Sequence, residues 1–318
     1  KNNRDYRRVE EDFRKEMIMK GQRGSRAELK RALGLFDATA ISIGAIIGAG
    51  IFVVTGVVAG LAGPGVVVSI VVAGVIASFT ALSFAQLSAY MPREGGGYQF
   101  TYRMVSPYAG FLAGWMWVFS NIFVGAAVSL GFAQYLTAIF PSLPVNVVAV
   151  LVCLSFTFLN YVGVRQSAMV NNVLVVAKIL ILVFFIALGL GFTRINNFNP
   201  FMPKGFLGVL EGAALIFFAY FGYARVTIVA EEVKDASHTI PRAIILALII
   251  STVLYVLIGF VAVGLVGSQR LAASGSPLAE AISVTGNFMA VFVVSLGGMI
   301  ATASVLLMAI LGVSRMIF

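Results

Sequence analysis

The sequence predicts an all-α integral membrane protein with a broken-helix, inverted-repeat fold. Hydrophobic residues make up 60% of the 318 residues, and charged residues only 11%. Eight segments are long and apolar enough to cross a lipid bilayer, and glycines interrupt the first and the sixth of them. Two interrupted spans that lie five helices apart are typical of membrane proteins built from inverted repeats.

The composition excludes a soluble globular domain. Such domains carry about a quarter charged residues, and a chain with a mean hydropathy of +0.98 could not cover its own surface with polar side chains. The chain holds one cysteine, Cys153, and one histidine, His238, so it can form neither an internal disulfide nor a metal-binding cluster of these residue types. We therefore expect no metal and no organic cofactor.

Residues 1–36 form a basic tail ahead of the first span. They hold eleven Lys and Arg against six Asp and Glu. A basic tail could bind nucleic acid, but this one adjoins a membrane span, which favours a cytoplasmic segment held close to anionic lipid headgroups. The expected partner of the tail is the lipid bilayer and not a nucleic acid.

Eight apolar segments reach the roughly 20 residues that a helix needs to span the hydrocarbon core. In chain order they cover residues 38–61, 66–91, 107–136, 145–164, 167–192, 206–230, 243–266 and 281–313. The third and the eighth segments are longer than one bilayer thickness, so we expect these two helices to tilt or to project.

The charges between the spans predict the orientation of the chain. With the N-terminus in the cytoplasm, seventeen Lys and Arg lie on the inside, whereas the outside holds only Arg194, Lys204 and Arg270. This positive-inside bias predicts a multi-pass protein of the plasma membrane with a cytoplasmic N-terminus.

The first span carries three glycines, Gly44, Gly48 and Gly50, within seven residues. Each glycine costs about 1 kcal/mol relative to alanine inside a helix, and two interpretations of the cluster stay open. The spacing of Gly44 and Gly48 suits close packing of small residues against another helix. Alternatively, the helix unwinds at residues 48–50, and the amides exposed there form a carboxylate site near the middle of the membrane.

The sixth span favours the second interpretation. Gly222 lies in the middle of this span, among bulky aromatic residues. The sixth span enters from outside, whereas the first leaves the cytoplasm, and this is the inverted topology of a second repeat. We therefore predict a binding site between the two interrupted helices and treat the repeat symmetry itself as a hypothesis.

Four short motifs follow one another along the chain: G-x-x-I-G-x-G-I-F at 44–52, P-R-E-G-G-G-Y at 92–98, E-E-V-K-D with T-I-P-R-A-I at 231–244, and G-V-S-R-M at 312–316. Together they resemble the amino acid–polyamine–organocation permeases of the prokaryotic amino acid transporter type. The resemblance implies a leucine-transporter-like fold with five-plus-five inverted repeats and twelve spans, truncated here to about eight. Residues 37–192 would form the first five-helix repeat, and residues 193–318 the first three helices of an incomplete second repeat.

The resemblance also implies how a substrate would bind to the interrupted helices. The substrate carboxylate would meet backbone amides of the first span, at Gly48, Ala49 and Gly50. The substrate amino group would meet backbone carbonyls of both spans, at Ile46, Phe218 and Phe221. Beside Gly222, the side chains of Tyr220 and Phe221 would form an aromatic wall.

Lys178 lies near the middle of the fifth span, which is otherwise uncharged. It is too deep for its side chain to reach either interface easily. Lys178 is either a proton-coupling group or a structural lysine bonded to backbone carbonyls. The resemblance favours the coupling role, because some members of the family carry a lysine at this position, where sodium-coupled relatives bind a cation. The sequence therefore predicts proton-driven uptake.

Arg225 follows Gly222 in the sixth span, and Glu232 lies two helical turns later on the same face. One interpretation is that Arg225 points to the cytoplasmic vestibule and pairs with acids there. The other is that Arg225 and Glu232 belong to an inner gate.

These observations predict a secondary active transporter of amino acids that is proton-coupled and works by alternating access. A bundle of the first, second, sixth and seventh spans would rock against the remaining helices. A polyamine or cationic amino acid exchanger is the alternative within this class, and a non-transporting fragment or an amino acid sensor is the alternative outside it. An enzyme is not expected, because no histidine or aspartate lies deep in a span. The oligomeric state stays open.

Overall fold

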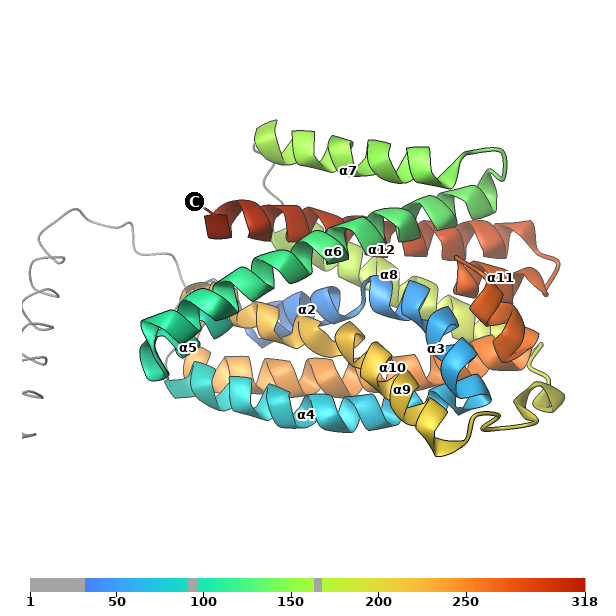
Figure 1. Ribbon diagram of the computed structural model, residues 1–318, viewed down its shortest axis with the longest axis horizontal. Coiled ribbons are helices and arrows are strands. Elements are labelled where there is room, and N and C mark those ends of the chain that lie inside the picture. Colours follow the sequence, from blue (N-terminus) through green and yellow to red (C-terminus); the bar gives the residue numbers. More distant parts are fainter. Residues whose placement is uncertain (1–31, 91–95, 163–167, 318) are drawn as a thin grey trace, which may run out of the picture.

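The computed structural model describes residues 32–90, 96–162 and 168–317, and nearly all of them are helical (Figure 1). The first half of the chain forms α2 (Leu35–Ile46), η1 (Gly50–Val54), α3 (Thr55–Ala62), η2 (Gly63–Gly65), α4 (Val66–Tyr90), α5 (Gly96–Met104), α6 (Pro107–Ile139) and α7 (Val145–Val162). The second half forms α8 (Ala168–Leu190), η3 (Ile195–Phe198), α9 (Gly205–Phe217), η4 (Phe218–Glu232), α10 (Ala236–Ala273), α11 (Pro277–Ser283) and α12 (Phe288–Ile317).

Within the described ranges, seven helical segments are long and apolar enough to cross a membrane. The first of them, Leu35–Ala89, has 55 residues. A single helix of that length would measure about 80 Å, whereas the hydrocarbon core is about 30 Å thick. The chain instead turns at η2, so that α4 runs back in the opposite direction and packs on α3, α9 and α10 (Figure 1). This segment therefore contains both the first and the second predicted spans, and the chain is a multi-pass membrane protein.

The eighth predicted span begins too early. The structure places a separate short helix, α11, ahead of α12, which starts only at Phe288. The two helices are separated at Gly286, which has a positive φ of 68° and which few residues other than glycine could occupy. The side chain of Asn287 then accepts a hydrogen bond from the backbone N–H of Met289 at 2.9 Å and so starts α12.

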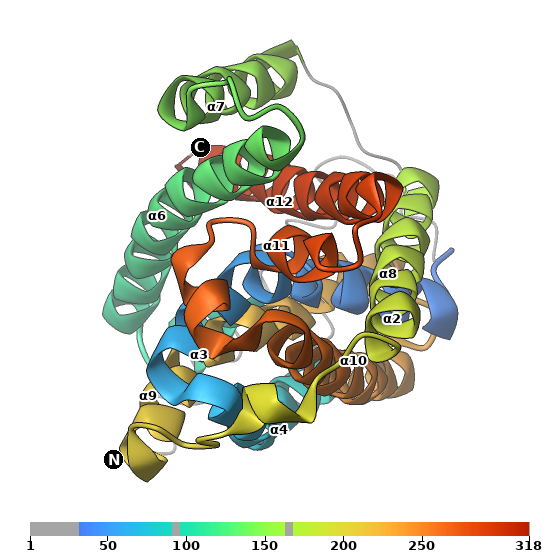
Figure 2. The same ribbon diagram turned by 90° about the vertical axis from the view of Figure 1, so that its right-hand side faces the viewer.

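The helices fall into two groups (Figures 1 and 2). One group, which we call the bundle group, comprises α2, η1, α3, α4, α9, η4 and α10, and these elements pack on one another. The other, the scaffold group, comprises α6, α7, α8 and α12; α12 packs against the other three. The interrupted first span lies between the groups, because α2 packs on α10 and η4 on one side and on α8 on the other.

A short main-chain pairing joins the start of the first span to the end of the sixth. Leu33 and Val233 form a parallel β-bridge. The backbone N–H groups of Ala32 and Leu33 both donate to the Glu232 carbonyl at 3.0 Å, and the N–H of Lys234 donates to the Leu33 carbonyl at 2.9 Å. The two interrupted spans are thus bonded to each other at this end.

Candidate functional site

The first span is interrupted at Ile47 and Gly48. α2 ends at Ile46, and Ile47 has non-helical angles, with φ −75° and ψ 82°. This is the conformation of an inverse γ-turn, and the N–H of Gly48 accordingly donates to the Ile46 carbonyl at 2.8 Å. Gly50 already opens the π-helix η1. The interruption therefore lies at the start of the segment in which the sequence predicts unwinding.

The glycines of both interrupted spans also allow close packing. A Cβ atom at Gly222 would overlap the backbone of Ala45 and Ile46, and one at Gly50 would overlap Ala219. The first and sixth spans therefore touch through their backbones at the interruption. Close packing of the first span on the sixth thus uses Gly50 and Gly222, whereas of the pair Gly44 and Gly48 it is Gly48 that faces Val305 of α12.

The sixth span changes its helix type and does not unwind fully. α9 ends at Phe217, and the residues from Phe218 to Glu232 continue as the 3₁₀ helix η4. The change begins four residues before Gly222, the position that the sequence indicates. A 3₁₀ segment of this length is unusual, because its hydrogen-bond geometry is poorer than that of an α-helix.

Lys178 binds the carbonyl end of α2. The Lys178 side chain is 1% exposed. Its Nζ donates to the Gly44 carbonyl at 2.9 Å, to the Ile47 carbonyl at 2.9 Å and to the Ser304 Oγ at 3.3 Å. An ammonium has three N–H donors, so all three are used. A cation at a helix C-terminus also interacts favourably with the helix dipole. The lysine thus bonds to backbone carbonyls, as one of its two interpretations expects.

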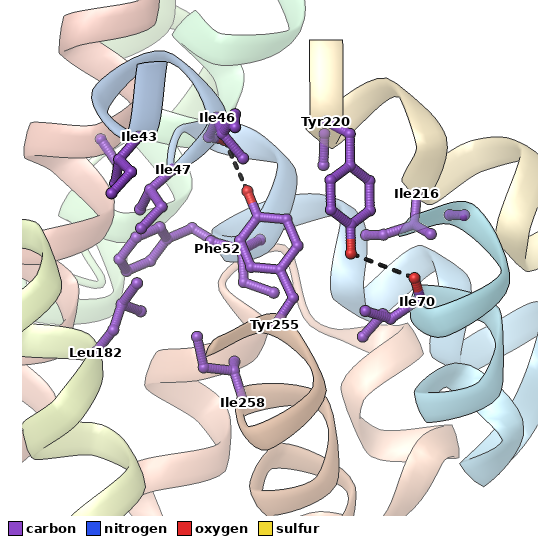
Figure 3. Close-up of a cluster of buried hydrophobic side chains, with 14 of the residues drawn as sticks. Ile43, Ile46, Ile47, Phe52, Ile70, Leu182, Ile216, Tyr220, Tyr255 and Ile258 are labelled. Carbon is purple, nitrogen blue, oxygen red and sulfur yellow. Dashed lines mark hydrogen bonds between the residues drawn. The ribbon is translucent and has the colours of Figure 1, made fainter. Parts of the chain in front are cut away.

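The Ile46 carbonyl has two donors. Besides the N–H of Gly48, the hydroxyl of Tyr255 in α10 donates to it at 2.7 Å (Figure 3). A carbonyl oxygen has two lone pairs, and both are taken in this conformation. An amino group that binds at Ile46, as the family resemblance implies, would have to displace one of these two donors.

The aromatic residues predicted to line the site lie in different environments. Tyr220 is fully buried, and its hydroxyl donates to the Ile70 carbonyl of α4 at 3.2 Å (Figure 3). Its ring lies 5.4 Å from the ring of Tyr255. Phe218 and Phe221 are instead 41% and 52% exposed. The structure therefore brings Tyr220 together with Tyr255 and α4, and leaves the two phenylalanine side chains on the surface of the described part of the chain.

Comparison with known proteins identifies the family. The profile of the family described as "Amino acid permease" matches residues 33–318, nearly the whole chain. The chain belongs to the amino acid permease family. The branched-chain amino acid permease BcaP of Bacillus subtilis is 35% identical over 91% of this chain and 67% of its own length. The chloroplastic cationic amino acid transporter 9 of Arabidopsis thaliana is 34% identical over 91% of this chain and 54% of its own.

A solved structure shows the same fold. It is that of Mhp1, a nucleobase-cation-symport-1 family transporter, in a closed conformation with bromovinylhydantoin bound. The TM-score is 0.54 at 16% identity, over 92% of this chain and 69% of that chain. The likeness confirms the predicted leucine-transporter-like fold of this permease. The chain spans about two thirds of the length of the bacterial relatives that it matches.

Arg225 and Glu232, the two residues predicted for a possible inner gate, are not bonded to each other among the described residues. In the described part of the permease, Arg225 is half-buried and makes neither a hydrogen bond nor an ion pair. The backbone carbonyl of Glu232 instead receives the two N–H groups of Ala32 and Leu33. Glu232 thus contributes to the end of η4 through its main chain.

Sequence reasoning missed Tyr255. The only indication of its role in the sequence is the polar hydroxyl within an apolar span. Such a hydroxyl needs an acceptor inside the protein, because lipid offers none. Which acceptor it finds depends on how α10 packs on α2, and the sequence pattern carries no information on that contact.

Proposed function

We propose that this permease carries amino acids across the membrane by alternating access around the two interrupted spans. The observation that supports this most directly is the direct contact of the first and sixth spans at Gly50 and Gly222, with the carbonyl end of α2 held by a buried lysine. Binding sites of secondary transporters are formed by interrupted helices of this kind. The bundle group would rock against the scaffold group.

We propose that the N-terminus lies in the cytoplasm and that the membrane is the plasma membrane. The Lys and Arg residues between the spans support this orientation. The end of the molecule that holds Leu33 and Val233 is then the inner end, and the end that holds α11 is the outer end.

The substrate would bind through backbone groups of both interrupted spans. Its carboxylate would meet the amides of Gly48, Ala49 and Gly50, at the N-terminus of the helix that resumes after the interruption, with the Gly48 N–H shared between the carboxylate and the Ile46 carbonyl. Its amino group would meet the carbonyls of Ile46, Phe218 and Phe221, and at Ile46 it would displace the hydroxyl of Tyr255. Binding therefore depends on the position of α10 as well.

Lys178 would couple transport to protons. The charged side chain holds Gly44, Ile47 and Ser304 with its three donors. A neutral amine has one donor fewer and no charge, so loss of the proton would loosen the end of α2 at the substrate site. We propose that this change in bonding links proton release to the movement of the first span.

Uptake into proteoliposomes under an imposed inward proton gradient tests this function. The protein is used with any residues that its natural chain carries beyond Phe318, with labelled amino acids, with and without sodium. We expect saturable uptake that follows the proton gradient and ignores sodium. Lys178→Gln should reduce the gradient-driven uptake about tenfold or more, because hydrogen bonds to a charged group contribute about 1.5–3 kcal/mol.

The matched control is Lys204→Gln, which removes an exposed lysine at the start of α9. This variant should retain the response to the gradient. A Lys178→Gln variant that takes up amino acids with unchanged dependence on the gradient would contradict the coupling role. No uptake of any amino acid by the unmodified protein would favour an amino acid sensor.

A cationic amino acid exchanger is the second candidate, because the relatives include cationic amino acid transporters of Arabidopsis thaliana and of the mouse. Uptake of labelled arginine that depends on amino acid loaded inside the vesicles, and not on the proton gradient, would favour it.

A further inference from the structure

Three polar contacts join the first span to the scaffold group in the described part of the chain. Lys178 makes the middle contact, at the interruption. At the outer end, the hydroxyl of Tyr135 in α6 donates to the carbonyl of Phe52 in η1. At the inner end, the Nδ2 of Asn172 in α8 donates to the Oδ1 of Asp37 in α2 at 3.1 Å. The second and third contacts lie on opposite sides of the interruption.

The outer contact is fully buried. Tyr135 has no exposed surface, and its ring meets the ring of Phe52 edge to face, with 5.9 Å between centroids. The same ring covers Gly298 of α12, where a Cβ atom would overlap it. Tyr135 thus connects the outer half of the first span with α6 through its hydroxyl, and its ring packs on α12.

The inner contact uses both oxygens of one carboxylate. The Oδ2 of Asp37 accepts the backbone N–H of Gly34 at 3.0 Å, which caps the start of α2. The Oδ1 accepts the amide of Asn172. The Oδ1 of Asn172 itself is buried and has no hydrogen-bond partner among the described residues. Asp37 is thus fixed within its own helix, and Asn172 is the part of the contact that belongs to the scaffold group.

We propose that these two contacts are opposed latches on the first span. Opening to the outside separates Phe52 from Tyr135, and opening to the inside separates Asp37 from Asn172. The inference rests on the proposed alternating access, in which the bundle group moves against the scaffold group. Each latch closes one side, so that the balance between them sets which side of the permease is open at rest.

Other buried tyrosines do not act in this way. The hydroxyl of Tyr223 donates to the Thr80 Oγ1 at 2.7 Å, and both residues belong to the bundle group. Tyr220 and Tyr255 likewise bond within the bundle group. A movement between the two groups leaves these bonds intact, so Tyr223→Phe is a matched control for Tyr135→Phe.

Labelling of single cysteines with a membrane-impermeant thiol reagent tests the latches. Cys153 is first replaced by alanine, and the natural full chain is used in oriented vesicles. Val53→Cys reports on the outer side, because Val53 packs against Gly131 one turn from Tyr135. Val175→Cys reports on the inner side, because Val175 is 2% exposed and lies one turn from Asn172.

The two latch variants should act in opposite directions. Tyr135→Phe should raise the labelling rate at Val53→Cys and lower it at Val175→Cys, and Asn172→Leu should do the reverse. Each change should be about fivefold, as expected from the loss of one buried hydrogen bond. Tyr223→Phe should change neither rate. If Asn172→Leu does not fold, the smaller Asn172→Ala replaces it.

Equal rates in Tyr135→Phe and Tyr223→Phe, or shifts in the same direction in both latch variants, would overturn the proposal. Opposite shifts in a protein that takes up no amino acid would support the latches and contradict the proposed substrate. Amino acid uptake by a protein whose labelling rates do not change in either latch variant would support the transport function and contradict the latches.

Discussion

At the scale of single residues, the site is defined by the donors on the last carbonyls of α2. Lys178 occupies the carbonyls of Gly44 and Ile47, and Tyr255 occupies that of Ile46. Carbonyls at the end of a helix have no partner within the helix, and in an apolar surrounding each would be costly to leave unpaired. Two side chains, one from α8 and one from α10, thus stabilise the interruption of the first span. The residues of the first span do not provide these hydrogen bonds themselves.

Tyr255→Phe should increase the apparent affinity for amino acids. The substitution keeps the ring next to Tyr220 but frees one lone pair of the Ile46 carbonyl, so that the substrate amino group no longer has to displace a hydroxyl. We expect the apparent KM of uptake to fall up to about tenfold. Initial rates of uptake at varied amino acid concentrations measure it.

The control for this variant is Tyr223→Phe, because the hydroxyl of Tyr223 bonds to the Thr80 Oγ1 of α4 and not to a carbonyl of the interruption. Its KM should stay close to that of the unmodified protein. A KM that rises in Tyr255→Phe would mean that the hydroxyl holds the site in its binding geometry and does not compete with the substrate.

The sequence predicts the position of Lys178 but not its partners. A charged residue in the middle of an apolar span must be satisfied inside the protein, and depth in the span can be read from the sequence. Ser304 lies 126 residues away along the chain, and its proximity depends on the packing of α12 on α8. The same limit applies to Arg225 and Glu232, because their spacing along the span does not show which side chains they meet. Their role in an inner gate stays a prediction.

At the scale of the elements, the interrupted spans are held together by backbone contact. Gly222→Ala should destabilise the protein by about 1–3 kcal/mol or more, because a methyl group would overlap the backbone of Ala45 and Ile46 and not a movable side chain. The change is measured by heating the protein in detergent and following the loss of its monodisperse peak in size-exclusion chromatography.

Gly191→Ala is the matched control for this prediction. A Cβ atom at Gly191 would make only ordinary contact, 3.7 Å from the Leu188 carbonyl oxygen. If Gly222→Ala unfolds at the same temperature as Gly191→Ala, the first and sixth spans are farther apart in solution than in the structure.

The sequence predicts elements well where hydrophobicity decides and poorly where the backbone bends. The start of α6 follows directly from Ser106, which accepts a hydrogen bond from the N–H of Ala109, and from Pro107 at the first helical position. The separation of α11 from α12 depends on the positive φ of Gly286, which hydropathy does not record. Hydropathy alone therefore merges these two helices.

At the scale of the whole molecule, the bundle and scaffold groups should move as two bodies. Spin labels at Val75 on α4 and Val253 on α10, both exposed and both in the bundle group, should keep their distance when an amino acid is added. Labels at Val75 and at the exposed Phe123 on α6 should change their distance by several ångströms, because this pair crosses between the groups. Pulsed electron–electron double resonance measures the distance between the labels in both pairs.

Distances that change equally in both pairs would contradict rigid-body rocking and would favour bending of single helices. Distances that change in neither pair, in a protein that takes up amino acids, would restrict the motion to the interrupted spans themselves.

The main-chain bridge between Leu33 and Val233 has a mechanical consequence. It links two points of the chain that lie 200 residues apart in sequence, one just before the start of the first span and one just after the end of the sixth. A force that displaces Ala32 and Leu33 would therefore act on the ends of both interrupted helices at the same time. A partner that binds next to these residues could therefore change the conformation of the transport site without contacting the substrate.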